Sequence, residues 1–358
     1  MTDGYHTGES HDIISRCVPF YVRSLAWRVG NRKLDPRLGS ALASVALYAL
    51  GIAMAWITGN LVQVLSLWLF HASILLFFVG TFLLADAYHR TCRLLGSLLA
   101  LCPTQDGIEF ISRGFHRMYC SKWQYVTCMI GALGLPAWFI LLGGTEVPFT
   151  LPYVVYVCIG GGVIAFFIFS GIWLAVTSAA FVIALSKRRD VRLLPVWPAT
   201  TTALRNISSW IGTMSIYFAI EVVLLLGVAI THECPGQYVY GAFITSLVSA
   251  AIPFVTLYLV SPQFAISKMV KREKERQLNL LGNQMLHLYA PTDELPSPQQ
   301  LLQYSQLMQM VSGSPNHPMS LPGILKSVAS LALPLGLLYD QYREILSAII
   351  ASLQKAFP

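Results

Sequence analysis

One acidic residue lies near the middle of a long apolar run. Glu221, in IYFAIEVVLLL, has no compensating charge within that run. Because a carboxylate is costly in hydrocarbon, we expect Glu221 to face the interior of a helix bundle, either protonated or paired. Two interpretations stay open: an ion- or proton-sensitive group in a transport pathway, or a neutral carboxyl hydrogen-bonded to a neighbouring helix.

A histidine lies in another apolar run, nearer to the end of that run. His71, in LFHASIL, is expected to make a structural hydrogen bond rather than to relay protons or bind a cofactor. If the side chains of His71 and Glu221 meet inside the bundle, the pathway interpretation gains weight for both. These two residues are our candidates for the intramembrane polar groups of a pathway.

Histidines and cysteines recur at helical spacing in one polar segment. His89 and Cys92 are three residues apart on one helical face with Asp86, and His116 and Cys120 are four residues apart. Such spacing could assemble a zinc site between two helices. The signal has low specificity, because no CxxC pair occurs and the 7 cysteines are scattered over the chain. We therefore predict solvated or packed side chains, with no metal site and no cofactor.

Familiar catalytic and pore motifs are absent from the sequence. It contains no GxxxxGK[ST] phosphate loop, GxSxG elbow, HExxH pair or dinucleotide fingerprint, so an enzyme is not favoured. The loop between the last two long apolar runs is too short for a pore helix and filter, and no TVGYG-like run occurs. A tetrameric cation channel of the potassium-channel type is thus disfavoured.

The composition indicates that lipid surrounds much of the chain. Hydrophobic residues make up 55% and charged residues 11%, with a mean hydropathy of +0.60. A soluble domain carries about 25% charged residues. We predict an all-α, polytopic helical membrane bundle. Its apolar runs long enough to cross about 30 Å of hydrocarbon are residues 41–59, 64–85, 125–143, 152–173, 210–230 and 239–260.

The positive charges predict how these six spans are oriented. All 24 Lys and Arg residues lie in the N-terminal arm, in the loops after the second and fourth spans, or after the sixth span. The three other connections carry only Glu146 and Glu233 as charged residues. By the positive-inside rule, both termini are cytoplasmic and the protein is multi-pass in the cell membrane. Basic residues placed in this way do not suggest nucleic acid as a partner.

The chain divides into an arm, a bundle and a tail. The predicted parts are an interfacial arm (1–39), a six-span bundle (40–262) with cytoplasmic loops 86–123 and 187–207, a cytoplasmic helix (263–290) and a helical tail (291–358).

The sequence also predicts the secondary structure of three segments. The loop 86–123 is predicted to form two helices joined near Pro103, and Phe149–Ser186 to form one long helix. Within the amphipathic tail, Leu321–Leu338 is a candidate seventh span. It contains Lys326 and Pro334, so we favour a re-entrant, interfacial or protein-packed segment.

Prolines follow small residues in the third and sixth spans. Pro136 and Pro253 are predicted to bend these helices. Two three-span halves of opposite orientation would resemble the inverted repeats of transporters, in which broken helices mark the binding site.

We expect a channel or transporter, homo-oligomeric in the bilayer, that moves ions or small solutes. The alternative is a membrane-embedded sensor, effector or scaffold that binds a cytoplasmic protein partner through residues 263–358.

Overall fold

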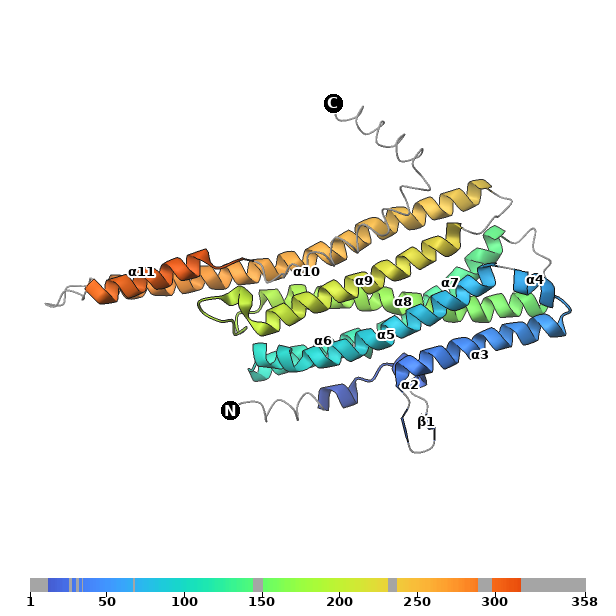
Figure 1. Ribbon diagram of the computed structural model, residues 1–358, viewed down its shortest axis with the longest axis horizontal. Helices are drawn as coiled ribbons and strands as arrows, with labels where there is room; N and C mark the ends of the chain where they lie inside the picture. The colour runs from blue at the N-terminus through green and yellow to red at the C-terminus, as the bar shows by residue number, and fades with distance from the viewer. Residues whose placement is uncertain are drawn as a thin grey trace, which may run out of the picture.

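Long α-helices running roughly along one axis form the body of the molecule (Figure 1). The computed structural model describes residues 12–25, 28–29, 32–33, 35–66, 68–143, 151–230, 237–288 and 298–316. Its elements are α2 (Phe20–Leu25), β1 (Arg28–Val29), β2 (Arg32–Lys33), α3 (Pro36–Ile57), α4 (Leu61–Ser66), α5 (Trp68–Leu101), α6 (Gln105–Tyr119), α7 (Lys122–Gly143), α8 (Leu151–Lys187), η1 (Pro198–Thr200), α9 (Thr202–Ile230), α10 (Gln237–Leu288) and α11 (Pro298–Gly313). The predicted helical fold class is confirmed, and the short antiparallel pair β1–β2 is its one departure among the described residues.

Four described helices are long and apolar enough to cross a membrane. They are Pro36–Ile57 in α3, Phe70–Leu101 in α5, Ile159–Lys187 in α8 and Thr202–Leu224 in α9. These four match the first, second, fourth and fifth predicted spans. The third and sixth predicted spans fall within α7 and α10, which are helical throughout the predicted ranges. Membrane crossing by those two helices, and hence a total of six spans, stays a prediction.

Several predicted boundaries agree with the structure. The loop 86–123 contains the end of α5 and the whole of α6, and α6 starts after Thr104, whose hydroxyl accepts a hydrogen bond from Gly107 N at 3.1 Å. This N-cap satisfies a helix-terminal donor. The apolar stretch after residue 149 forms a single helix, α8. The helix predicted over 263–290 is present as the continuation of α10, with no helix boundary at Pro262.

The core lies where α5, α6, α8 and α9 meet. Leu95 and Leu99 of α5, Tyr119 of α6 and Leu204 of α9 are fully buried there. By contrast, many apolar side chains elsewhere point outward, as Ile130 of α7 does with 65% of its surface exposed. Outward apolar side chains are expected of helices surrounded by lipid.

Some sequence predictions concern residues outside the described part of the chain. Glu146, Glu233 and the candidate seventh span, 321–338, belong to this group. The backbone is helical at Pro136 and Pro253, but their side chains are not described, so the predicted bends stay predictions.

Candidate functional site: a carboxyl between four helices

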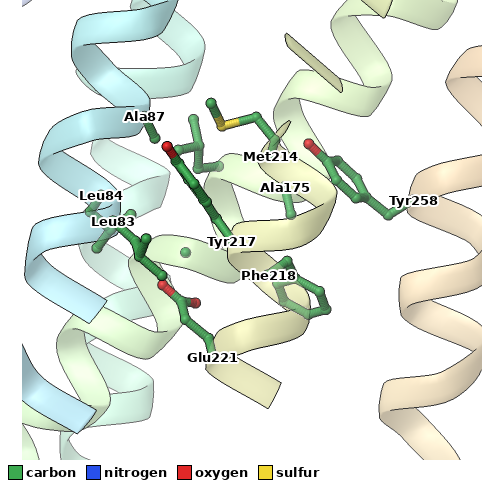
Figure 2. Close-up of a pocket in the computed structure, with 11 residues that line it drawn as sticks. Leu83, Leu84, Ala87, Ala175, Met214, Tyr217, Phe218, Glu221 and Tyr258 are labelled. Carbon is green, nitrogen blue, oxygen red and sulfur yellow. The ribbon is translucent and has the colours of Figure 1, made fainter. Parts of the chain in front are cut away.

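A small pocket lies among α5, α8, α9 and α10 (Figure 2). Its volume is about 30 Å³. The side chains around it are mainly apolar, with three polar groups among them. The lining residues are Leu83, Leu84, Ala87, Gly171, Leu174, Ala175, Met214, Tyr217, Phe218, Glu221 and Tyr258.

Glu221 brings the one ionisable carboxyl to this lining. It lies on α9, and its oxygens point toward α5 in Figure 2. Room for the carboxyl depends on Gly171 of α8, where an added Cβ would lie 2.7 Å from Glu221 Oε2. Among the residues that the structure describes, none is paired with this carboxyl by a hydrogen bond or a salt bridge. The structure thus places the predicted pathway residue in a pocket inside the helix bundle.

Tyr217 connects the pocket to a buried acidic group. It precedes Glu221 by one helical turn, and its hydroxyl donates to Asp86 Oδ2. Arg90 Nε donates to both members of this contact, at 2.5 Å from Asp86 Oδ2 and at 2.9 Å from the Tyr217 hydroxyl oxygen. Arg37 of α3 pairs with the same carboxylate, of which only 7% is exposed. Two arginines therefore compensate the buried charge.

These partners of Asp86 could not be identified from the sequence. The sequence placed Asp86 only on a face with His89 and Cys92, and gave Tyr217 and Arg37 no role. Arg90 is the exception, because it follows Asp86 by four residues and side chains at that spacing are neighbours on a helix. The sequence alone could therefore have suggested this pair. Arg37 and Tyr217 lie on other helices, so only the packing brings them to Asp86.

Tyr258 closes the opposite side of the pocket. Its side chain extends from α10 toward α8 and α9 in Figure 2. The Tyr258 hydroxyl lies 3.3 Å from Ser178 Oγ of α8. The aromatic rings of Tyr258 and Phe218 also pack at 6.4 Å between centroids. The polar end of Tyr258 is thus held by α8.

His71 lies away from the pocket. Its ring nitrogens contact the Tyr48 hydroxyl at 3.4 Å and the Leu65 carbonyl at 3.0 Å. Leu83, which lines the pocket, follows His71 by twelve residues on α5, or about 18 Å along the helix axis. The two predicted polar residues therefore do not meet, and His71 has the structural contacts expected of a packed histidine.

The four low-specificity candidates for zinc ligands, His89, Cys92, His116 and Cys120, do not form one group among the described residues. His116 and Cys120 lie together with Cys17, whereas His89 is exposed and belongs to no such group among the described residues. The hydrogen bond with Cys17 lowers the pKa of Cys120, and the nearby charge of Arg23 acts in the same direction. Cys17 was not among the candidate metal ligands, because its contact with His116 joins residues 99 positions apart.

A second ion pair, partly buried, lies at the junction of α5, α6 and α8. Asp190 accepts hydrogen bonds from Arg188 Nε at 2.8 Å and from Thr104 Oγ1 at 2.7 Å. The bond from Arg188 holds the pKa of Asp190 well below its usual range. This junction fixes the segment after α8 to the N-terminus of α6.

Comparisons of the chain with protein-family models, with curated proteins and with solved structures found no match. The geometry of the pocket and the chemistry of its residues are therefore the basis for inferring a function.

Proposed function

We propose that this chain is an integral membrane transporter or channel for protons or small cations, with Glu221 as the group that the cargo neutralises. The observation that carries the proposal is the Glu221 carboxyl in a mostly apolar pocket, without a paired cation among the described residues. An unpaired carboxylate in such surroundings is costly. Binding of a proton or of a cation removes that cost.

The size of the pocket supports a small cargo. At about 30 Å³ it exceeds the volume that one water molecule needs, about 10 to 15 Å³. Pockets for organic ligands measure about 300 to 1,000 Å³. The pocket suits a proton, delivered through water, or a small cation. It does not suit an organic solute in the conformation described.

The cluster around Asp86 is proposed as the cytoplasmic end of the pathway. Under the predicted six-span topology, with both termini inside the cell, Arg37 and Arg90 lie toward the cytoplasm. Tyr217 lies between this cluster and Glu221 on the same face of α9. Its hydroxyl both donates and accepts hydrogen bonds, so it can pass a proton between the pocket and Asp86.

Flux through reconstituted protein tests the proposed class. The full chain is placed in liposomes that enclose a pH-sensitive dye, and a potassium diffusion potential drives proton entry. We expect acidification faster than in protein-free liposomes, or an equivalent sodium or lithium flux when the dye is exchanged for a cation indicator. Equal rates with and without protein for all of these ions would contradict the proposal.

A second function is favoured by the length of α10. This helix has 52 residues and spans about 78 Å, more than twice the thickness of the hydrocarbon core. Its C-terminal part extends beyond the other long helices and packs against α11 (Figure 1). We propose, as the alternative, that this extension binds a cytoplasmic protein and that the bundle serves as sensor or anchor.

Affinity purification separates the two functions. The full chain and a variant that ends at residue 290 are purified from the same cells. A partner that is lost with residues 291–358, together with an absence of ion flux, would favour the sensor or scaffold. Flux retained by the shortened chain without a lost partner would favour transport.

A further inference from the structure

Two thiols and an imidazole meet at the junction of the N-terminal arm with α6. Cys17 follows a short helical segment at residues 12–16, and His116 and Cys120 lie in and directly after the last turn of α6. One ligand atom from each lies within 4.8 Å of the other two. Cys17 Sγ and His116 Nδ1 are 3.8 Å apart. No part of the proposed transport pathway uses these three side chains.

The spacing agrees with tetrahedral zinc. Zinc bonds of about 2.3 Å to sulfur and about 2.0 to 2.1 Å to nitrogen place neighbouring ligand atoms about 3.6 to 3.8 Å apart. The distance of 3.8 Å from Cys17 Sγ to His116 Nδ1 lies within about 0.2 Å of the value for a sulfur and a nitrogen ligand. The remaining pairs, which lie within 4.8 Å, need side-chain shifts of at most about 1 Å to reach it. Two thiols and an imidazole are also a ligand set that zinc favours over magnesium or calcium.

The backbone holds the three residues in place without a metal. Phe115 and Tyr119 are buried in the core, which fixes the rotation of α6 and hence the direction of His116. Cys120 N donates to His116 O at 2.8 Å, and Cys17 N donates to Ile14 O at 3.2 Å. Cys17 is itself buried. Ligands positioned in this way lose little conformational freedom when a metal binds.

The surroundings leave a route for the metal. His116 is exposed and Cys120 is partly exposed, so an ion can reach the group from solvent. Three protein ligands leave one tetrahedral position for a fourth ligand. A bound ion would connect the segment 12–25 to α6, two parts of the chain that are far apart in sequence.

We propose that Cys17, His116 and Cys120 form a zinc site that fastens the N-terminal arm to α6. The sequence pattern grouped His116 and Cys120 with His89 and Cys92 of α5. In the structure, Cys17 lies beside His116 and Cys120 instead. The site is separate from the pocket at Glu221, so its test does not depend on ion transport.

Metal analysis of the full-length protein in detergent tests this proposal. The protein is purified under reducing conditions, stripped with a chelator, incubated with buffered free zinc and measured by inductively coupled plasma mass spectrometry. We expect about one zinc per chain for the unchanged protein. Each loss of a ligand should lower zinc occupancy at least about tenfold, since even the loss of a residue that only orients a ligand weakens metal binding about 10- to 100-fold. The three variants are Cys17→Ser, His116→Asn and Cys120→Ser.

A matched control comes from another cysteine. Cys128 is buried on α7 beside Ser170 and belongs to no metal-binding group among the described residues. Cys128→Ser should keep the zinc content of the unchanged protein. Cobalt(II) in place of zinc should give thiolate charge-transfer absorption that Cys17→Ser reduces and Cys128→Ser does not.

Three results would overturn the site. The first is a stripped, monodisperse protein that takes up no zinc. The second is a Cys17→Ser variant that binds as much zinc as Cys128→Ser. The third is a disulfide between Cys17 and Cys120, found by mass spectrometry after alkylation of protein isolated under reducing conditions.

Discussion

At the scale of single residues, the position of Glu221 depends on a missing side chain. Gly171 leaves the space into which the carboxyl extends, and any larger residue would compete for it. The displaced group would be the end of a flexible side chain rather than backbone or a ring. A substitution there should therefore disturb the carboxyl more than the fold.

We predict that Gly171→Ala lowers ion flux at least about tenfold, as expected when a functional group is misplaced by about 1 Å. Its thermal stability should change little, because the carboxyl can move aside. Gly131→Ala provides the contrast, since its Cβ would overlap the ring of Phe169. That variant should lose about 1 to 3 kcal/mol of stability. Unchanged ion flux in the Gly171→Ala variant would show that transport does not depend on the position of the Glu221 carboxyl.

The candidate site was predictable only in part. Glu221 could be recognised because a single carboxyl in an apolar run is costly wherever it packs. Tyr217 and Cys17 could not, because a tyrosine or a cysteine is tolerated in many environments and only tertiary contacts distinguish them. For the same reason the sequence could not show that His71 contacts Tyr48 instead of Glu221.

At the scale of elements, the segment between α8 and α9 is fixed by polar contacts. Arg192 N donates to Leu101 O at 2.9 Å, and Arg272 of α10 donates to Arg188 O at 2.7 Å. The Arg188 guanidinium also lies 4.9 Å from the centroid of the Phe110 ring. Asp190 joins this junction through Arg188 and Thr104. Its charge should therefore contribute to stability.

The sign of this contribution follows from the lowered pKa of Asp190. The folded state binds fewer protons than the unfolded state, so the stabilisation is complete above the unfolded pKa of about 3.9. It is lost as the pH falls through the folded pKa. Asp190→Asn should lower the free energy of unfolding by about 1 to 2 kcal/mol at pH 7. Below pH of about 3.9 the difference from the unchanged protein should narrow.

Thermal unfolding in detergent at pH 7 and pH 3 measures this difference. Asp12→Asn serves as the control, because its pair with Arg16 is exposed and should contribute less than about 0.5 kcal/mol. A difference between Asp190→Asn and the unchanged protein that does not depend on pH would contradict the electrostatic explanation.

The element boundaries were more predictable than the contacts between elements. Length and hydropathy located the six long helices, and the break near Pro103 followed from a helix-terminating residue. Pro262 shows the limit of such rules, since α10 continues through it. A proline is tolerated within a helix where neighbouring groups satisfy the carbonyl group that it leaves unpaired.

At the scale of the whole molecule, charge placement predicts the orientation. We expect a cysteine placed at Thr145 to react with a membrane-impermeant thiol reagent in intact cells. A cysteine at Ser347 should react only after permeabilisation, because both termini are predicted inside. Parallel labelling of the unchanged protein corrects for its own cysteines. Labelling of Ser347→Cys from outside the cell would contradict the predicted cytoplasmic C-terminus.

The central claim is that Glu221 carries the transported charge, and matched Glu to Gln variants test it most directly. Glu221→Gln keeps the shape of the side chain but cannot be ionised, whereas Glu109→Gln changes an exposed carboxyl on α6 that pairs with Arg113. In liposomes of equal protein content, we predict that Glu221→Gln lowers proton or cation flux at least about tenfold, the scale of effect expected when a positioned proton-transfer group is lost. Glu109→Gln should match the unchanged protein. Equal flux through all three proteins would contradict the account.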